Sequence, residues 1–290
     1  MKRIPLLSVL LLLPALSLVV VVGCSKPTVE KDKDKTKDKD KTEKPSPGVK
    51  TEITSDTKAV VKGTVKVKGG KFPEMKEVAA LGMHGDKETC LKGGHNDKND
   101  QTWIGKNGAV ENVVVWLEPP ADKKYKITDA LKEPFKKTVE IDQPFCMYRP
   151  HVVGVLAKDQ AIQFLNSATL THNVKLHFGN PLIAKPLDDN LGPGKKSDTR
   201  TMDVTKESLF TAECTAHTWM RARVFVSPHP YFAVTKEDGT FSIANVPVDT
   251  ELSVVYWHES LGTDLGSKKE LKKASFKAGD TSLEIELEAK

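Results

Sequence analysis

One short stretch of the chain places three metal-binding side chains close together. Cys214, His217 and Met220 follow one another at the spacing Cys-x2-His-x2-Met. A second imidazole lies upstream at His172, in the sequence Thr-His-Asn-Val. Two histidine nitrogens, one cysteine sulfur and a weak axial methionine form the ligand set of a blue-copper electron-transfer site. The spacing therefore predicts a type 1 copper centre with these four ligands.

Each residue type has a chemical reason to be there. The soft thiolate bonds both Cu(II) and Cu(I), two imidazoles complete a trigonal plane that suits either state, and the long axial thioether tunes the potential. Neither oxidation state then requires much ligand movement, so we expect fast one-electron transfer. A copper enzyme would instead need an open position that water can reach. We therefore expect the chain not to be an enzyme. A copper enzyme is the weakest of three hypotheses, and the other two are given below.

These ligands can meet only if the chain folds in a particular way. The ligands Cys214, His217 and Met220 must share one tight loop, and His172 must come from a neighbouring strand, as in a Greek-key sandwich. Apolar residues alternate along several stretches, which is typical of half-buried strands. The clearest of these stretches are Ala59–Val67, Gly108–Leu117, Ala161–Asn166, His172–Phe178, Ala222–Val226, Leu252–Trp257 and Leu283–Leu287. One short helix is expected at 128–131, and no segment has a sustained helical period, so the sequence predicts an all-β fold.

At these residues the chain resembles a known family. Cys214 to Val226, which reads CTAHTWMRARVFV, together with His172-Asn173-Val174 resembles the amicyanin and plastocyanin group of cupredoxins. The short Cys-x2-His-x2-Met loop resembles that of amicyanin in particular. The resemblance covers residues 138 to 227 and implies a Greek-key sandwich that binds one type 1 copper ion.

The resemblance also implies roles for individual residues. It implies four copper ligands: His172, Cys214, His217 and Met220. It implies that Asn173 ties the two ligand loops together by hydrogen bonding, and that His217 presents its ring edge at the surface as the electron port. Two positions depart from the family, since Glu213 precedes the cysteine where an aromatic residue is common and Thr218 replaces a common proline.

The flanks of this region resemble a different family. Val234 to Trp257, with its Asp-Gly-Thr-Phe-Ser-Ile-x-x-Val-Pro core, resembles half of a carboxypeptidase regulatory-like, transthyretin-type β-sandwich. Lys62–Val65 and Asn112–Val115 resemble the opening strands of that module. The resemblance implies a second, transthyretin-like sandwich formed by the two flanks, with the cupredoxin inserted between them. The chain then divides into three folded parts: an N-terminal β segment at 58–137, a copper domain at 138–228 and a second β segment at 229–290.

The N-terminus has the pattern of a targeting segment. Two basic residues precede an almost wholly apolar stretch, Leu6 to Val22, which is typical of a secretory signal at 1–23. Val21-Val22-Gly23-Cys24 resembles the bacterial lipobox, which implies cleavage before Cys24 and acylation of its thiol. An ordinary signal anchor or a short transmembrane helix is the alternative. The lipobox favours an exported bacterial lipoprotein that faces the periplasm or the cell surface, on the outer membrane if the cell has one.

Residues 24–57 continue as a low-complexity segment. Lys and Asp alternate almost residue by residue through Lys31–Lys41, which leaves no apolar face to bury. Such a segment cannot offset the conformational entropy that is lost when a chain becomes ordered. We expect a disordered tether that lifts the folded body off the lipid surface.

Assigning one cysteine to lipid and another to copper leaves Cys90 and Cys146. In an exported protein these two most simply form a disulfide. The alternative is a second metal site that includes the histidines nearby in sequence: His84, His95 and His151. The polar stretch at 82–108, which holds Cys90, has no pattern that predicts an element.

Charge narrows the function class further. The formal net charge of +5 is modest and is spread along the chain, so nucleic-acid binding is not expected. The first hypothesis is a membrane-tethered electron carrier whose partners are exported redox proteins, such as a c-type cytochrome or a dehydrogenase. The second is a copper-binding or structural surface lipoprotein that stores or delivers the metal or acts as a scaffold.

Overall fold

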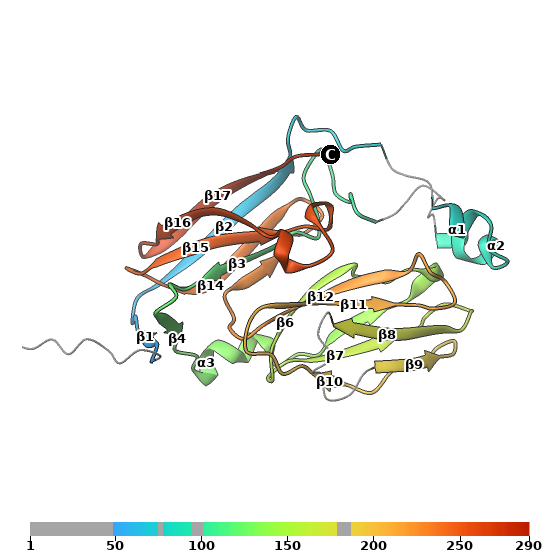
Figure 1. The fold of residues 1–290 in the computed structure, drawn as a ribbon, viewed down its shortest axis with the longest axis horizontal. Helices are drawn as coiled ribbons and strands as arrows, with labels where there is room; N and C mark the ends of the chain where they lie inside the picture. The colour runs from blue at the N-terminus through green and yellow to red at the C-terminus, as the bar shows by residue number, and fades with distance from the viewer. Residues whose placement is uncertain (1–48, 75–77, 94–100, 179–186, 290) are drawn as a thin grey trace, which may run out of the picture. The chain divides into compact units, whose positions relative to one another are not determined.

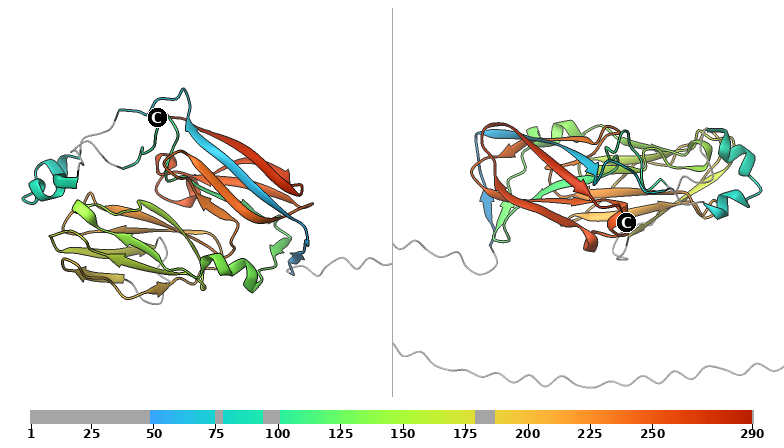
Figure 2. Two further views of the ribbon diagram at one scale, coloured as in Figure 1. Left: turned by 180° about the vertical axis from the view of Figure 1, so that it is seen from behind. Right: turned by 90° about the horizontal axis from the view of Figure 1, so that it is seen from above.

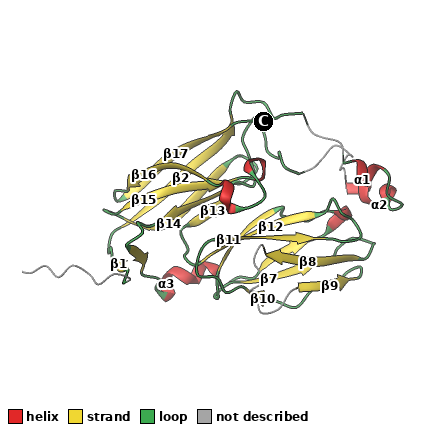
Figure 3. Cartoon of the chain, viewed as in Figure 1, coloured by secondary structure: helices red, strands yellow, loops and turns green. Residues whose placement is uncertain are grey.

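The computed structural model describes residues 49–74, 78–93, 101–178 and 187–289 of the 290-residue chain. The predicted signal segment, Cys24 and the Lys/Asp-rich part of the predicted tether lie outside the described residues. Strands dominate what is described and the helices are short (Figure 3), so the predicted all-β class is confirmed. Within this part of the chain, no helix has the length and apolar character needed to cross a membrane.

The described residues in the middle of the chain form eight strands. They are β5 (Val139–Asp142), β6 (Val152–Leu156), β7 (Ala161–Leu165), β8 (His172–Phe178), β9 (Leu187–Leu191), β10 (Arg200–Thr201), β11 (Ser208–Glu213) and β12 (Arg221–Ser227). One sheet has the order β6-β12-β11-β8-β9 and the other the order β10-β7-β5 (Figure 1). β6 runs parallel to β12 and β5 parallel to β7, whereas the other neighbours are antiparallel.

Alternation along these strands explains the core between the two sheets. Ile162 and Phe164 of β7 and Phe210 of β11 are buried, whereas their neighbours in sequence are less buried. This period of two turns one set of side chains inward on each sheet. The resulting core also contains Cys214 and Met220, so the predicted ligand loop is packed into it.

The flanks of the chain supply the strands of a second pair of sheets. They are β2 (Lys58–Val67), β3 (Val114–Glu118), β13 (Phe232–Val234), β14 (Thr240–Pro247), β15 (Glu251–Trp257), β16 (Lys269–Ser275) and β17 (Gly279–Leu287). The sheet orders are β13-β3-β15-β16 and β14-β2-β17. β2 and β3 precede the middle strands and pair with strands that follow them, so the two flanks build this second sandwich together.

The remaining elements are short. They are β1 (Thr51–Ile53), β4 (Lys123–Tyr125), α1 (Ala79–Gly82), α2 (Lys87–Cys90), α3 (Asp129–Lys132) and the 3-10 turns η1 (Leu91–Gly93), η2 (Glu133–Phe135), η3 (Pro144–Cys146), η4 (Glu259–Leu261) and η5 (Leu265–Ser267). α3 confirms the single expected helix, shifted by one residue. Figure 2 shows α1 and α2 beside one end of the middle sheets in both of its views.

The tether predicted at 24–57 overlaps a strand near its C-terminal end. Thr51–Ile53 forms β1 and pairs in parallel with β4, with Ile53 opposite Tyr125. Ile53 is buried and packs in the core of the flanking sheets. One buried apolar residue and three residue pairs with β4 therefore hold this segment in the fold. The alternating charges of the preceding residues do not predict this contact.

A mixed cluster joins the two sandwiches. Trp116 from β3 and Phe225 from β12 pack with ring centroids 5.1 Å apart in an apolar group drawn from both. Beside it, Glu259 in η4 accepts from Arg223 Nη2 at 2.6 Å and contacts His151 Nε2 at 2.7 Å. We call Arg223, Glu259 and His151 the ionic junction.

Candidate metal centre

Strand pairing brings two of the predicted ligands together. β8 begins at His172, and β11 ends at Glu213, directly before Cys214. The two strands are antiparallel neighbours, with Glu213 opposite Lys175. The end of β11 therefore lies beside the start of β8, because antiparallel strands place opposite ends together. This pairing carries Cys214 to His172 across a long separation in sequence.

The loop that holds the other ligands closes on itself. Met220 N donates to His217 O at 2.8 Å, and Cys214 N donates to Met220 O at 3.3 Å. These two bonds bend the chain tightly between β11 and β12, so that all three residues face the same buried region.

Asn173 fastens this loop to β8. Its Oδ1 accepts from Thr215 N at 2.7 Å and from the Thr215 hydroxyl at 3.0 Å. Its backbone carbonyl accepts from Gln143 Nε2 at 3.2 Å and from the Tyr148 hydroxyl at 3.1 Å. The residue after one ligand therefore contacts the residue after another, as the resemblance implies.

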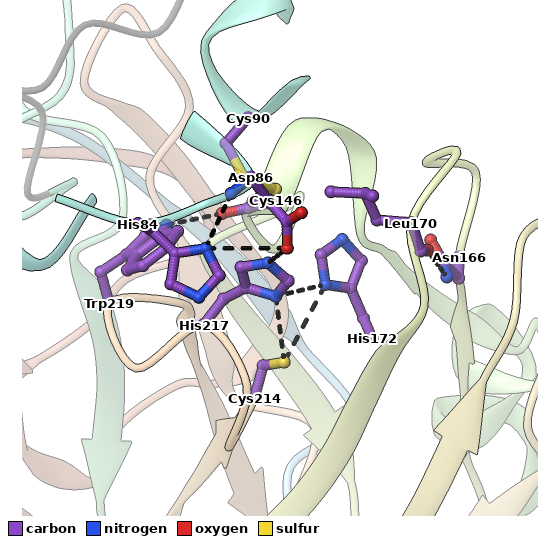
Figure 4. Close-up of polar contacts among 10 residues, drawn as sticks. All are labelled: His84, Asp86, Cys90, Cys146, Asn166, Leu170, His172, Cys214, His217 and Trp219. Carbon is purple, nitrogen blue, oxygen red and sulfur yellow. Dashed lines mark hydrogen bonds and ion pairs between the residues drawn. A yellow bond between two sulfur atoms is a disulfide. The ribbon is translucent and has the colours of Figure 1, made fainter. Parts of the chain in front are cut away.

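Three donor atoms form a compact triangle in the core (Figure 4). His172 Nδ1 lies 3.1 Å from His217 Nδ1, and Cys214 Sγ lies 3.9 Å and 3.8 Å from these two nitrogens. All three side chains are at most 2% exposed. The sequence-predicted His172, Cys214 and His217 are therefore brought together by the fold.

The triangle has the size that one metal ion needs. A point equidistant from its three corners lies about 2.1 Å from each, close to the bond lengths that first-row ions form with imidazole nitrogen and thiolate sulfur. A thiolate and two imidazoles suit copper in either oxidation state. The residues present thus fit the ion that the sequence predicts.

Burial keeps both imidazoles ready to bind a metal. Burial, together with a smaller contribution from the nearby His217, lowers the pKa of His172 to about 4. Burial also lowers the pKa of His217, although the hydrogen bond to Asp86 acts in the opposite direction. Both rings are therefore neutral at physiological pH, which is the form that ligates metals.

The fourth predicted ligand, Met220, is fully buried in the same core. Its backbone is tied to Cys214 and His217 by the two bonds described above. Its role as the axial ligand stays a prediction. Glu213, which stands where the cupredoxins that the sequence resembles commonly have an aromatic residue, points away from the site. Its side chain is exposed, and its Oε2 lies 3.4 Å from His177 Nε2.

A segment that the sequence left uninterpreted lies over the site. We call residues 78–93, which contain α1, α2 and η1, the cover. Asp86 Oδ2 of the cover lies 3.1 Å from His217 Nε2. The rings of His84 and Trp219 lie 4.8 Å and 5.2 Å from the His217 ring (Figure 4).

The cover corrects one expectation about His217. The sequence resemblance implies a ring edge at the surface, but the side chain is only 2% exposed. Asp86, His84 and Trp219 occupy the space around that edge. The physical reason is the added polar stretch before β3, which the resemblance does not span.

The predicted disulfide between Cys90 and Cys146 is confirmed, and it anchors the cover next to η3. With both sulfurs in this bond, the alternative metal site built on these thiols is wrong. Of the histidines considered for it, His84 lies in the cover, His151 belongs to the ionic junction and His95 lies outside the described residues.

The sequence pattern gives no role to Asp86 and considers His84 only for the alternative metal site at Cys90 and Cys146, although both residues contact the site. The one available signal is the disulfide, which ties the stretch around Asp86 to the middle sheets. A disulfide at Cys90 does not specify which neighbouring side chain meets His217. That choice depends on the turn between α1 and α2, where Asp86 N donates to His84 Nδ1 at 3.2 Å.

No family model and no curated protein matches the chain. Among solved structures, the chain is similar to the Cu-containing nitrite reductase NirK from Thermus scotoductus SA-01, with 16% sequence identity and a TM-score of 0.27. That match covers 31% of this chain and 22% of the reductase, so the chain spans less than a quarter of its length.

Two small copper proteins are also similar to part of the chain. A purple cupredoxin from Nitrosopumilus maritimus has 17% identity and a TM-score of 0.26, covering 31% of this chain and 99% of that one. The oxidised form of an amicyanin point mutant has 18% identity and a TM-score of 0.27, covering 39% of this chain and 92% of that one. The side chains of the site, and not these partial matches, therefore indicate its chemistry.

Proposed function

We propose that this chain is a membrane-anchored type 1 copper protein that carries single electrons between exported redox partners. The observation that supports it best is the buried triangle of His172 Nδ1, His217 Nδ1 and Cys214 Sγ. Three soft or borderline donors at these separations match a trigonal copper site better than the oxygen-rich sites that hold calcium or magnesium.

Some residues of the site bind the metal, and others hold the binding residues in place. His172, Cys214 and His217 hold the ion, and Met220 supplies the weak axial sulfur. Bound copper supplies a one-electron Cu(II)/Cu(I) couple. The hydrogen bonds of Asn173 and the burial of every ligand keep the donors in place in both states. Burial also excludes water and substrate, which favours a carrier over an enzyme.

The anchor and the partners are part of the same proposal. The lipobox at Val21–Cys24 would attach the chain to a membrane through acylated Cys24. The Lys/Asp-rich stretch would then act as a tether that lets the copper domain move away from the membrane and contact a c-type cytochrome or a dehydrogenase. Placement on the periplasmic or cell-surface side follows from the export signal.

Copper loading tests the core of the proposal. The protein loaded with Cu(II) should absorb intensely near about 600 nm, because a thiolate transfers charge to the metal. Cys214→Ala should abolish that band, whereas Cys24→Ala, which leaves the thiol of Cys214 in place, should retain it. Rapid one-electron exchange with a reduced c-type cytochrome should accompany the band. A colourless copper-loaded protein whose metal uptake survives Cys214→Ala would indicate storage or delivery instead.

Membrane attachment is tested separately. In a bacterial host that acylates lipoproteins, the full chain should fractionate with membranes, and Cys24→Ala should release it or leave it uncleaved. Ser25→Ala is the matched control, since it leaves the lipobox cysteine intact. Unchanged fractionation and processing of Cys24→Ala would contradict the lipid anchor.

A further inference from the structure

The cover makes one direct polar contact with a predicted copper ligand. Asp86 Oδ2 lies 3.1 Å from His217 Nε2, and the Asp86 side chain is 41% exposed while that of His217 is 2% exposed. His217 Nδ1 points the other way, toward Cys214 and His172. Figure 4 shows the carboxylate on the far side of the His217 ring from the Cys214 sulfur.

This arrangement has a known physical consequence for a metal-binding histidine. A ligating imidazole that donates its second N–H to a carboxylate has a fixed tautomer, a fixed ring orientation and a more basic ligating nitrogen. We propose that Asp86 is the positioning residue for His217: its carboxylate accepts the Nε2 proton and so holds the Nδ1 lone pair toward the metal site. This inference rests on the proposed copper function.

The other histidine ligand has no such partner. His172 Nε2 is buried and makes no hydrogen bond to the part of the chain that the structure describes. The two Nδ1 atoms lie 3.1 Å apart, within hydrogen-bond distance, so the tautomers of the two rings decide which nitrogen would donate when no metal lies between them. If Asp86 keeps the proton of His217 on Nε2, the donor is His172 Nδ1.

Asp86 itself is held in place by the cover. Its backbone N–H donates to His84 Nδ1 at 3.2 Å, and the His84 ring packs at 5.2 Å on the Trp219 ring. Trp219 Nε1 in turn donates to Cys146 O at 3.1 Å, beside the disulfide that anchors Cys90. The cover and the ligand loop are thus linked through several contacts around His217.

A fixed carboxylate should also favour the oxidised site. It makes His217 a stronger donor and adds a negative charge close to the metal, and both effects favour Cu(II) over Cu(I). Replacing such a partner changes metal affinity by about 10–100-fold. A tenfold change in the ratio of the Cu(II) and Cu(I) affinities corresponds to about 59 mV for one electron.

The experiment uses the copper-loaded full chain and compares Asp86→Asn with Glu88→Gln. Both variants remove one carboxylate from the cover, but Glu88 is exposed in α2 and has no contact with His217. We expect Asp86→Asn to raise the reduction potential by at least about 59 mV, a tenfold loss in relative Cu(II) affinity. Glu88→Gln should leave the potential unchanged. Equal potentials in both variants would overturn the proposal.

A metal-free measurement separates this inference from the copper function. Nitrogen NMR of the apo protein should show His217 protonated at Nε2 and His172 at Nδ1, and Asp86→Asn should mix the His217 tautomers. If copper gives no blue band in any variant, the proposed function fails while this readout still decides the role of Asp86. A His217 protonated at Nδ1 in the apo protein would overturn that role.

A zinc titration tests whether Asp86 is itself a metal ligand, which is the other interpretation of the same contacts. The metal-binding atoms of His84, Asp86 and His217 lie within 4.8 Å of one another. Uptake of one Zn²⁺ ion by the copper-loaded protein, lost in both His84→Ala and Asp86→Asn, would mean that Asp86 binds metal and would overturn the positioning role. We expect no second ion to bind.

Discussion

At the level of single residues, the site depends on which donor atoms reach the ion. Cys214 and two imidazoles form a triangle, whereas Met220 is placed in the same core through its backbone. In the proposed copper site, the thiolate and the imidazoles would supply the strong bonds, and the thioether would tune the reduction potential. Sequence spacing named three residues whose donor atoms the fold brings together, because each donor type has a distinct chemical role; Met220 as the fourth ligand stays a prediction.

The role of Met220 can be tested against a second buried methionine. Met220→Leu removes the sulfur but conserves volume, so we expect the blue band to remain and the reduction potential to rise as Cu(II) loses a donor. Met202→Leu makes the same replacement elsewhere in the same core and should leave the potential unchanged. Protein-film voltammetry measures both. Equal shifts in the two variants would show that Met220 is not the axial ligand.

Residues outside any motif were harder to predict. Asp86 and His84 lie in a polar stretch with no periodicity, where a lone carboxylate or imidazole is most simply a solvated side chain. Their contacts with His217 arise only when the disulfide and the turn between α1 and α2 place them over the ring.

At the level of elements, the pairing of β8 with β11 positions the ligands, and Asn173 reinforces it. The alternation in β8 predicts correctly that His172 and Val174 face the core and that His177 does not. Alternation could not identify β16, whose Lys-rich sequence lies mostly exposed. Charged residues are common on edge strands, where they discourage unwanted pairing.

Asn173 gives a test of this element-level link. Asn173→Ala leaves the partly buried Thr215 N–H without its acceptor, which should destabilise the fold by about 1 kcal/mol and broaden the copper EPR signal. Asn190→Ala is a close control, because Asn190 is exposed and sits directly opposite Asn173 on β9. Denaturant melts and EPR of the copper-loaded variants check the two effects. Identical behaviour of both variants would contradict the link.

The short elements of the cover show a different limit. α1 and α2 span four residues each, too few to show a helical period in the sequence. These helices are held in place by contacts with distant residues, including the Cys90–Cys146 disulfide and the His84–Trp219 ring pair. Such contacts leave no trace in local composition.

At the level of the whole molecule, the flanks close a second sandwich around strands that are far apart in the chain. β2 pairs with both β14 and β17, and β3 with both β13 and β15. The ionic junction then joins this sandwich to the one formed by the middle strands. Burial works to raise the pKa of Glu259, but the hydrogen bond and charge of His151 and the charge of Arg223 outweigh it and lower the pKa to about 2.

This depressed pKa predicts how stability depends on pH. Glu259 stabilises the fold fully above its unfolded pKa of about 4.5, and that contribution is lost as pH falls toward about 2. The contribution is about 3 kcal/mol, since lowering a pKa by one corresponds to about 1.4 kcal/mol. We expect Glu259→Gln to lose this stability at pH 7 and to converge with the parent protein near pH 2.

The measurement is chemical denaturation of both proteins at several pH values from about 2 to about 7, which span the expected transition. Glu251→Gln provides the control, because Glu251 is exposed at the start of β15. A Glu259→Gln variant that differs from the parent equally at every pH would mean that packing, and not charge, explains the effect.

The sequence by itself determined the donor types and the all-β class and favoured the disulfide, because each depends on residue chemistry or on the period of a few neighbouring positions. The tertiary structure alone decided that Asp86 covers His217, that Ile53 belongs to the fold and that the ionic junction joins the two sandwiches. These are contacts between positions far apart in the chain. Alternation tells which face of a strand is buried but not which strand or loop covers it, since that depends on the packing of the whole molecule.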